Sequence, residues 1–600
     1  MKLCNSPKAI TKRSLACLIS WPLIVAPLWA TSFSLQANPN VSSSQRPDAG
    51  SILRDFRNLE REVETLPSIE RHEPLALTDD GQTVILRSVT FEGYQGLVSL
   101  DALNNLVADQ IGQELGFNGL MALADLVTGY LATQGYFLSF AYLPEQDITE
   151  GDLIIAILPV RVEGGQQWRP NIRLIEGANI DPDKVAAILR HSMQDDADIA
   201  INAKNMERGL LILNDLHGLS AQSLLERGEE FGTTRVNVMV LPTPRYTNNV
   251  WIDNYGGFYT GDLRANGLFN INNLTGQGDR LSALISQTRY LRFSSLTYST
   301  PVSPNGTMLN YSLSGTNYTL GNLDTVNLSG ETAGFTLGFR YPIIRSRSSN
   351  LYISPEFGYS RLRDFNDNEL TKSRIYNTFG LTLNGDRLDQ GGLGGYTGYS
   401  INYKRGDLNL NGSPDDAITQ DNLGPNHQGH FAKLNFDITR LQKISAQGAV
   451  YVKAQRQISL GGNLDSAETF SASGSSAVRA YAGGDASGDE GWLLNLEYRY
   501  DIPELSLLNG TFQLIGFYDH GMILINKKEF GEPTNNAGVN SYQIRGAGLE
   551  LIWARAGQYS LKATYAHKIE DKIERRSTVE TDSEGKNRSG RLWLQAMWWF

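Results

Sequence analysis

The sequence predicts a multidomain protein: a 16-stranded antiparallel transmembrane β-barrel that follows two small α/β units and an amphipathic helix. From residue 244 onward, helical periodicity stops and short segments alternate apolar with polar residues. An apolar face toward lipid and a polar face toward the lumen is the pattern of a transmembrane barrel. After residue 37 no uncharged apolar run reaches the roughly 18 residues that a transmembrane helix needs. The length of 600 residues also exceeds one ordinary core.

Residues 1–37 are interpreted as a secretory signal peptide, because basic residues precede an apolar run from Leu15 to about Ala30. Cleavage after Ala30 or after Ala37 fits equally well. An N-terminal membrane anchor is the alternative, although prolines interrupt the apolar run. Both cysteines of the sequence, Cys4 and Cys17, lie in this leader. The mature chain is therefore expected to contain neither a disulfide nor a thiolate metal site.

Residues 38–82 are predicted to hold one amphipathic helix and a linker. The helix is predicted to span Ser51 to Leu66, with Ser51 as its N-cap, and Pro67 ends it. Residues 67–82 form the linker and could span about 50 Å if extended. One narrow apolar stripe follows helical spacing between charged residues; it contains Ile52, Phe56, Leu59, Val63 and Leu66.

Two α/β units follow, over residues 83–163 and 164–243. Each has a strand, two helices and two further strands in sequence order. Two like units in tandem form a weak internal repeat. After Pro242 and Pro244 the alternating segments of the barrel, residues 244–600, begin.

We place sixteen alternating segments in residues 244–600. Connections after even-numbered segments are mostly short, and the long ones follow odd-numbered segments. Short periplasmic turns and long external loops are typical of outer-membrane barrels, whereas a soluble β-sandwich would not sort its loops in this way. The segments start near residues 250, 263, 281, 291, 309, 335, 351, 379, 399, 434, 446, 494, 512, 547, 559 and 591.

One long polar connection, Gln457 to Trp492, contains Val478-Arg479-Ala480-Tyr481. A disordered linker tends to lack such apolar residues, so we expect this loop to fold into the barrel lumen. On the thirteenth segment, Phe512, Leu514 and Gly516 share one face, and Asp519 lies on the other. Asp519 is therefore expected to face the lumen, within reach of Arg479. Two unrelated polar residues in water are the alternative.

These features resemble the two-partner secretion outer-membrane transporters, the TpsB proteins. That family secretes and activates haemolysins, haemagglutinins and contact-dependent toxins, within a superfamily of POTRA-plus-barrel proteins. The resemblance rests on the lead helix, the two α/β units, terminal Phe600 and three motifs. The motifs are Asn273-Leu274-Thr275-Gly276-Gln277-Gly278-Asp279, Val478-Arg479-Ala480-Tyr481 and Phe517-Tyr518-Asp519-His520-Gly521.

The resemblance implies specific roles. The α/β units would be POTRA domains, and the lead helix would plug the lumen. Val478, Arg479, Ala480 and Tyr481 would form a lumenal loop motif whose arginine pairs with Asp519 on the thirteenth strand. Phe600 would be a barrel-assembly signal. The family has glycine where Ala480 stands, and a positive φ there would cost about 1 kcal/mol. The lead helix could instead pack on the first α/β unit.

The resemblance also implies a function in the outer membrane of a Gram-negative bacterium, with the POTRA domains in the periplasm. The barrel would recognise a large unfolded exoprotein and pass it to the cell surface. A cytolysin, an adhesin, a contact-dependent toxin or a haem-scavenging protein would fit as cargo. Further expected partners are the barrel-assembly machinery and outer-membrane lipid, and a monomer is expected. A barrel-assembly or insertion factor of the same superfamily is the alternative, and a porin is a weaker one.

Composition and motifs exclude other classes. The net charge of −11 disfavours a nucleic-acid surface. No catalytic constellation is present, so neither an enzyme nor a cofactor is expected. His427 and His430 are the only close histidine pair, and such a pair on a loop is more often solvated than bound to metal. No metal site is expected.

Overall fold

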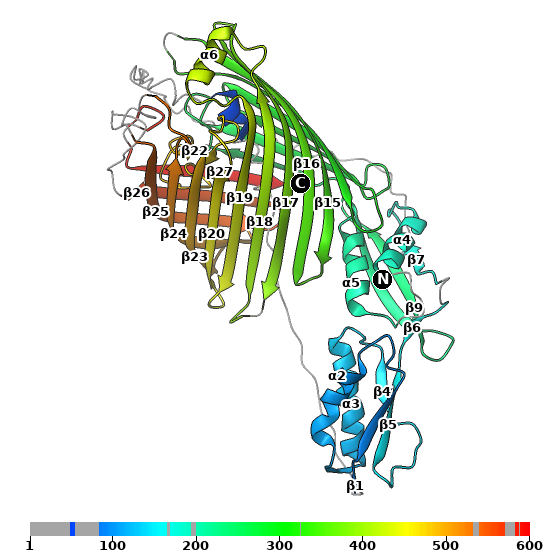
Figure 1. Ribbon diagram of the computed structural model, residues 1–600. Helices are drawn as coiled ribbons and strands as arrows, with labels where there is room; N and C mark the ends of the chain where they lie inside the picture. Colours follow the sequence, from blue (N-terminus) through cyan, green and yellow to red (C-terminus); the bar gives the residue numbers. More distant parts are fainter. Residues whose placement is uncertain are drawn as a thin grey trace, which may run out of the picture.

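The computed structural model describes residues 48–54, 83–164, 168–193, 200–323, 326–389, 391–531, 539–569, 582–586 and 588–600. The predicted signal peptide and linker lie outside them. Two α/β units extend from one end of a closed barrel (Figure 1). Within the described residues, no helix is both long and apolar enough to cross a membrane.

The first α/β unit packs two helices on a three-stranded sheet of order β2-β5-β4. Ser99 caps α2 by accepting a hydrogen bond from the backbone N–H of Ala102. The predicted order of elements is present, and two short strands, β1 and β3, pair beside it. The elements are β1 (Thr83–Ile85), β2 (Ser88–Glu92), α2 (Leu100–Val107), η2 (Ala108–Gln110), β3 (Glu114–Gly116), α3 (Phe117–Thr133), β4 (Phe140–Tyr142) and β5 (Asp152–Leu158).

The second α/β unit is organised around β9, which pairs with β6 and β7 in parallel and with β8 antiparallel. Asp181 and Asn202 cap its two helices through their side chains. The short strand β6 precedes residue 164 yet belongs to this sheet, because it pairs with β9. The elements are β6 (Arg161–Val162), β7 (Asn171–Leu174), α4 (Pro182–Ser192), α5 (Ala203–Asn214), β8 (Leu219–Arg227) and β9 (Thr233–Pro242).

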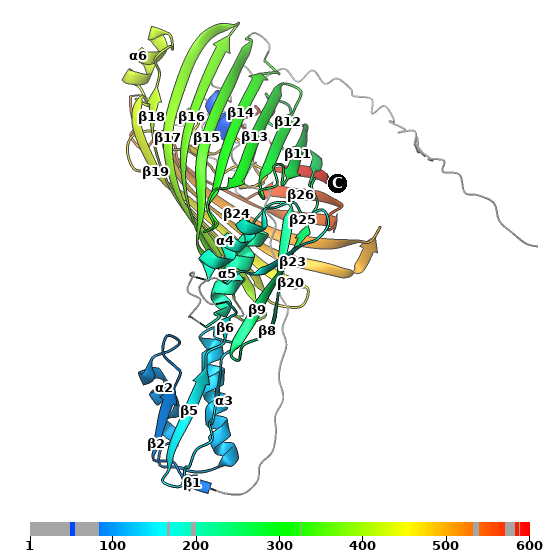
Figure 2. The ribbon, with the colours of Figure 1, turned by 90° about the vertical axis from the view of Figure 1, so that its right-hand side faces the viewer.

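The barrel has sixteen antiparallel strands, as predicted, and closes where β10 pairs with β27. Figure 2 shows the wall from the side. The strands are β10 (Asn249–Asp253), β11 (Arg264–Asn272), β12 (Arg280–Gln287), β13 (Leu291–Pro301), β14 (Met308–Thr319), β15 (Leu328–Arg345), β16 (Ser349–Asn366), β17 (Glu369–Asp389), β18 (Gly395–Asn409), β19 (Gly429–Lys443), β20 (Gly448–Ser459), β23 (Glu490–Leu507), β24 (Gly510–Leu524), β25 (Ser541–Arg555), β26 (Tyr559–Lys568) and β27 (Gly590–Trp599).

Several strands are longer than the apolar pattern predicts. Strands β15, β16 and β23 have 18 residues each and β17 has 21, against the roughly 9 to 11 that cross a membrane. Strand β17 begins at Glu369 rather than near residue 379. Backbone pairing does not need an apolar face, so the ladder continues beyond the lipid. The β18–β19 connection adds a helix that was not predicted, α6 (Asp415–Leu423).

The second α/β unit docks on the periplasmic turns of the barrel. Arg345, at the end of β15, donates two hydrogen bonds to the Asp215 carboxylate, at 2.6 and 2.8 Å. The motif at 273–279 forms the β11–β12 turn against the same unit. A Cβ on Gly278 (φ +77°) would lie 2.7 Å from the Cβ of Leu216, so this close approach requires glycine.

The same junction contains His217, whose backbone N–H donates to the carbonyl of Gly278. Burial lowers the pKa of the His217 imidazole to about 4, and the positive charge of Arg280 contributes to the shift. The ring is therefore neutral at neutral pH. These contacts fix the orientation of the second unit relative to the barrel.

Candidate functional site

The sixth external loop, residues 460–489, folds back into the barrel. It carries a two-stranded ladder of β21 (Phe470–Ser471) and β22 (Ser487–Gly488). Val478, Ala480 and Tyr481 are at most 1% exposed, because they pack against inward-facing side chains of the wall. Those wall residues are Leu493, Phe517, Ile523, Tyr542, Ile544 and Ala566. The structure thus places the loop where the sequence analysis expected it.

Arg479 and Asp519 are in direct contact in the lumen. The Arg479 guanidinium donates through Nε at 2.9 Å and Nη2 at 2.8 Å to the two carboxylate oxygens. The backbone N–H of Arg479 donates to the same carboxylate at 3.1 Å. Asp519 is fully buried. A bidentate pair of this kind fixes both the position and the orientation of the loop tip.

The site contains two further carboxylates that the sequence analysis did not assign. Nη1 of Arg479 lies 2.9 Å from Glu497 on β23 and 3.9 Å from Glu550 on β25. The guanidinium also stacks 3.5 Å from the ring centroid of Phe517. Burial acts to lower the pKa of Arg479, but the bonds and charge of Asp519 and its neighbours outweigh it and raise that pKa. The arginine is therefore charged.

Ala480 fits the loop tip without backbone strain. It is fully buried and is not among the non-glycine residues with positive φ. A Cβ on Gly546 of β25 would lie 2.7 Å from the Cβ of Ala480. The wall glycine therefore leaves the space that this side chain occupies. Trp593 of β27 completes the tip by donating from Nε1 to the carbonyl of Arg479 at 2.7 Å.

The lead segment, residues 48–54, also lies inside the barrel. Residues 49–54 are helical, and the N-cap is Asp48, whose carboxylate accepts from the N–H of Ser51. The predicted cap, Ser51, is already inside the helix. Ile52 is 4% exposed and packs in one cluster with Phe293 and Tyr376 of the wall. Phe56, Leu59 and Val63 of the predicted stripe lie outside the described residues.

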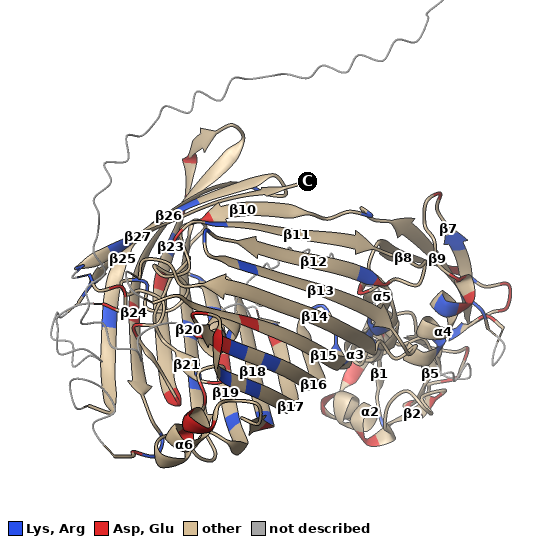
Figure 3. Cartoon of the chain, turned by 90° about the horizontal axis from the view of Figure 1, so that it is seen from above, with Lys and Arg blue, Asp and Glu red and all other residues tan. Residues whose placement is uncertain are grey.

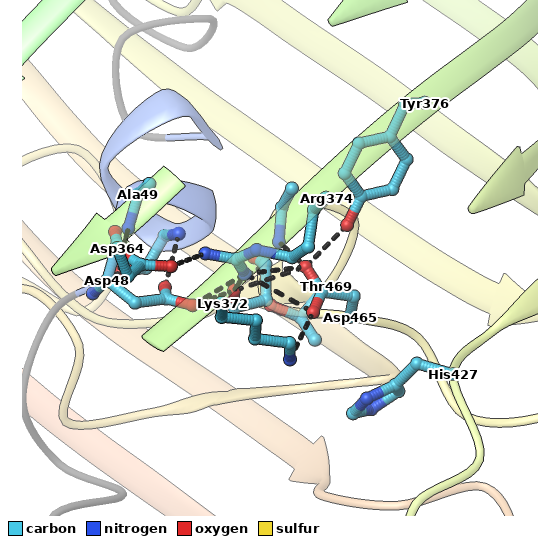
Figure 4. Close-up of polar contacts among 12 residues, drawn as sticks. Asp48, Ala49, Asp364, Lys372, Arg374, Tyr376, His427, Asp465 and Thr469 are labelled. Atoms are coloured by element: carbon cyan, nitrogen blue, oxygen red, sulfur yellow. Dashed lines mark hydrogen bonds and ion pairs between the residues drawn. The ribbon is translucent and has the colours of Figure 1, made fainter. Parts of the chain in front are cut away.

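Arg374 of β17 joins the lead segment, the wall and the sixth loop (Figure 4). Its side chain is fully buried. Nη1 donates to Asp48 at 2.7 Å and to Asp465 of the loop at 2.9 Å. Nη2 donates to Asp364 of β16, whose carboxylate also accepts from the N–H of Ala49 at 3.0 Å.

The charges of this Arg374 cluster do not fully cancel. Lys372 lies 3.3 Å from Asp465, and Tyr376 donates its hydroxyl proton to Asp465. Burial acts to raise the pKa of Asp48, yet the Arg374 charge together with the hydrogen bonds from Ser466 and Ser51 outweighs it, and the pKa is lowered. Three carboxylates therefore meet two cations, and removal of Arg374 would leave a strongly repulsive group.

The sixth loop has a second attachment to the same part of the wall. Glu468 lies 2.6 Å from Lys404 of β18 and 3.0 Å from Lys433 of β19. Lys433 also donates to the carbonyl of Glu468 at 2.6 Å. Seen from the external side, basic residues gather on β17, β18 and β19 (Figure 3). Residues 465–468 of the loop thus neutralise a basic region of the lumen.

The remaining predicted residues are placed as follows. Phe600 ends the chain beside β10, where its backbone N–H donates to the carbonyl of Asn248 at 2.9 Å. His427 and His430 face different carboxylates, Asp421 and Asp407, each at 3.0 Å. Within the described residues, no group of three or more His, Cys, Asp or Glu could hold a metal ion.

Comparison with known proteins supports one family. A family model described as haemolysin secretion/activation protein ShlB/FhaC/HecB matches residues 232–545, and a ShlB-type POTRA model matches residues 84–159. The heme/hemopexin transporter protein HuxB of Haemophilus influenzae is 25% identical over 559 residues, 91% of this chain and 95% of that protein. The outer membrane transporter CdiB of Escherichia coli is 25% identical over 487 residues, 76% and 77% of the two chains.

Two solved structures share the fold. CdiB from Escherichia coli superposes with a TM-score of 0.70 at 21% identity, over 92% of this chain and 99% of that one. CdiB from Acinetobacter baumannii gives a TM-score of 0.63 at 16% identity, over 92% and 97%. Both matches include the barrel together with the preceding units.

Proposed function

The chain belongs to the haemolysin secretion/activation protein family, and we propose that it is an outer-membrane pore that passes one large unfolded exoprotein to the cell surface. The observation that carries this proposal is that two non-covalently attached segments fill the lumen. The lead segment and the sixth loop both occupy it, and both are attached through ion pairs of Arg374 and Arg479. Such contacts can open without breaking a covalent bond or unfolding the wall.

The periplasmic units would select the cargo. The first unit ends its sheet with β4, whose outer side chains Phe140 and Tyr142 are each 40% exposed. Phe137, just before this strand, is 45% exposed. An extended segment of the exoprotein could add to this edge through backbone hydrogen bonds and place apolar side chains on these rings.

The lead segment would close the resting pore. Its helix buries Ala49, Ile52 and Leu53 against the lumen wall, and Asp48 ties it to Arg374. A barrel-assembly factor has no need of such a closure, so this feature favours secretion. Folding of the exoprotein outside the cell can drive transport, and no catalysed reaction or cofactor is required.

The relatives indicate that the cargo is a secreted exoprotein, and they include transporters of more than one kind. One relative is described as a heme/hemopexin transporter and another as an outer membrane transporter. A haem-scavenging exoprotein, a contact-dependent toxin, a cytolysin and an adhesin all fit the same lumen. Barrel-assembly machinery would recognise terminal Phe600 during insertion of the barrel, and a single chain would form the pore.

Co-expression with a candidate cargo, a very large secreted protein encoded by a neighbouring gene, tests the proposal. We expect the exoprotein in the culture medium only when the transporter is present. Deletion of residues 83–159, which spares β6 of the second unit, should leave the exoprotein in the periplasm, while the barrel still migrates anomalously on an unheated detergent gel. Equal secretion without the transporter, or secretion unaffected by that deletion, would contradict the proposal.

A further inference from the structure

The β23–β24 hairpin ends in an apolar tip at the periplasmic end of the barrel. We call residues 505–509 the hairpin tip. Leu505, Leu507 and Leu508 are 48%, 51% and 69% exposed. From Leu505 to Thr511 the sequence carries no ionisable side chain. In Figure 2 this hairpin, in orange, projects sideways from the barrel.

The turn of this hairpin is strained. Leu508 and Asn509 have φ of +49° and +59°, the backbone of a two-residue turn that favours Asn-Gly. A left-handed conformation costs a residue with a branched side chain about 1 kcal/mol or more. Strain at a bulky residue suggests a role for its side chain, and here the turn places a leucine at the most exposed point.

The tip continues the outer, lipid-facing side of the barrel. Asp519 of β24 faces the lumen, so alternation places Phe512 and Gly510 on the outer side. Leu507 pairs with Gly510 and lies on that side as well. A Cβ on Gly510 would lie 2.6 Å from both Trp553 Nε1 and Tyr559 Oη. The glycine thus allows two aromatic side chains to reach the tip.

Those aromatic side chains satisfy the backbone of the tip. Trp553 donates from Nε1 to the carbonyl of Leu507 at 3.1 Å, and Tyr559 donates to the carbonyl of Leu508 at 3.2 Å. Phe512 stacks on Trp553 with ring centroids 5.9 Å apart. Trp and Tyr gather where a membrane meets water, and transmembrane barrels have such a girdle at each interface.

We propose that the hairpin tip inserts Leu505, Leu507 and Leu508 into the periplasmic leaflet of the outer membrane. The occupant of this surface is phospholipid, because the surface is continuous with the aromatic girdle and faces away from the lumen. Backbone carbonyls at the boundary are already bonded to Trp553 and Tyr559, so the tip can leave water without exposing them.

The anchor would act on the strands that form the Arg479 site. Strand β23 carries Glu497, and β24 carries Asp519. Their shared periplasmic turn is the hairpin tip. Attachment to lipid therefore sets the depth of these two strands in the bilayer, independently of the second α/β unit, which docks on β11 and β15.

A single thiol tests this proposal in the full-length protein. Leu508→Cys, in a chain whose leader cysteines Cys4 and Cys17 are removed or replaced, is labelled with an environment-sensitive fluorophore. The labelled protein is reconstituted in phosphatidylethanolamine–phosphatidylglycerol vesicles, with or without brominated acyl chains. We expect blue-shifted emission that brominated lipid quenches and that aqueous iodide does not.

Gln447→Cys, on the exposed β19–β20 turn at the same end of the barrel, is the matched control. The fluorescence of its label should be quenched by iodide and not by brominated lipid. A second pair of variants carries the label at Leu505→Cys, with or without Leu508→Asn. Asparagine suits the left-handed turn and removes the apolar side chain of Leu508. Quenching of the label at position 505 by brominated lipid should therefore be weaker with Leu508→Asn than without it, while heat-modifiability of the barrel is unchanged.

Three outcomes would overturn the proposal. One is a Leu508 label as accessible to iodide as the Gln447 label. Another is lipid quenching at position 505 that Leu508→Asn leaves unaltered. Protection from iodide without quenching by lipid would also overturn it, since the tip would then be covered by protein.

Discussion

Replacing Arg479 by alanine is expected to abolish or strongly reduce release of the exoprotein, although the barrel still folds. The change removes the bidentate bond to Asp519 and leaves Asp519, Glu497 and Glu550 facing one another. Loss of one partner of a buried pair costs on the order of 3 kcal/mol, enough to release the loop tip. Immunoblots of medium and cells measure release, and unheated detergent gels measure the folded barrel.

Two related variants sharpen this prediction. Arg479→Lys retains the charge without the planar fork, so we expect partial secretion. The double variant Arg479→Ala/Asp519→Ala should be little worse than either single one, because the two residues act as a unit. Full secretion by Arg479→Ala would show that the loop attachment has no role in transport.

Replacing Arg374 by alanine is expected to open the resting pore. Asp48, Asp364 and Asp465 would then lie close together without the guanidinium that joins them. Their repulsion should displace the lead segment and the neighbouring part of the sixth loop. Single-channel conductance in a planar bilayer should rise, and cells should become sensitive to large antibiotics.

The comparison for this variant is deletion of residues 51–66, which should give the same phenotype while secretion continues. Arg363→Ala is the matched control, because Arg363 is a partly exposed β16 arginine that pairs with Glu331 away from the lead segment. If neither Arg374→Ala nor the deletion changed conductance, the lead segment would not be the closure.

The alternating pattern predicted all sixteen strands in order, because it reports which side chains face lipid. It failed at the external ends of β15 and β17, where most residues on both faces are polar and backbone pairing continues the strand. Helix α6 was missed for a related reason. Its residues show no apolar stripe of helical period.

The Arg479–Asp519 contact was expected because the family resemblance implies it, and alternation agreed by placing Asp519 inward. Glu497 also fell on the polar face of its segment, yet no pattern showed that it meets Arg479. The Arg374 cluster had no sequence signal. Asp465 is 91 residues and Asp48 is 326 residues from Arg374 in the chain, so only closure of the barrel brings them together.

Ala480 illustrates a prediction that depended on a distant residue. Because the family has glycine at this position, alanine there was expected to strain the backbone of the loop tip. The structure shows no positive φ at Ala480 and a glycine, Gly546, opposite it. The space for the methyl group comes from another strand, which single-position reasoning could not supply.

Cross-linking of an exoprotein arrested in transit tests the central claim most directly. Thr382 and Leu381 are neighbours on β17, and alternation from Arg374 places Thr382 in the lumen and Leu381, 36% exposed, toward lipid. An exoprotein fused to a domain that cannot unfold should cross-link to a cysteine at position 382 and not at 381. Cross-links at neither position, or equally at both, would contradict passage of the exoprotein through this lumen.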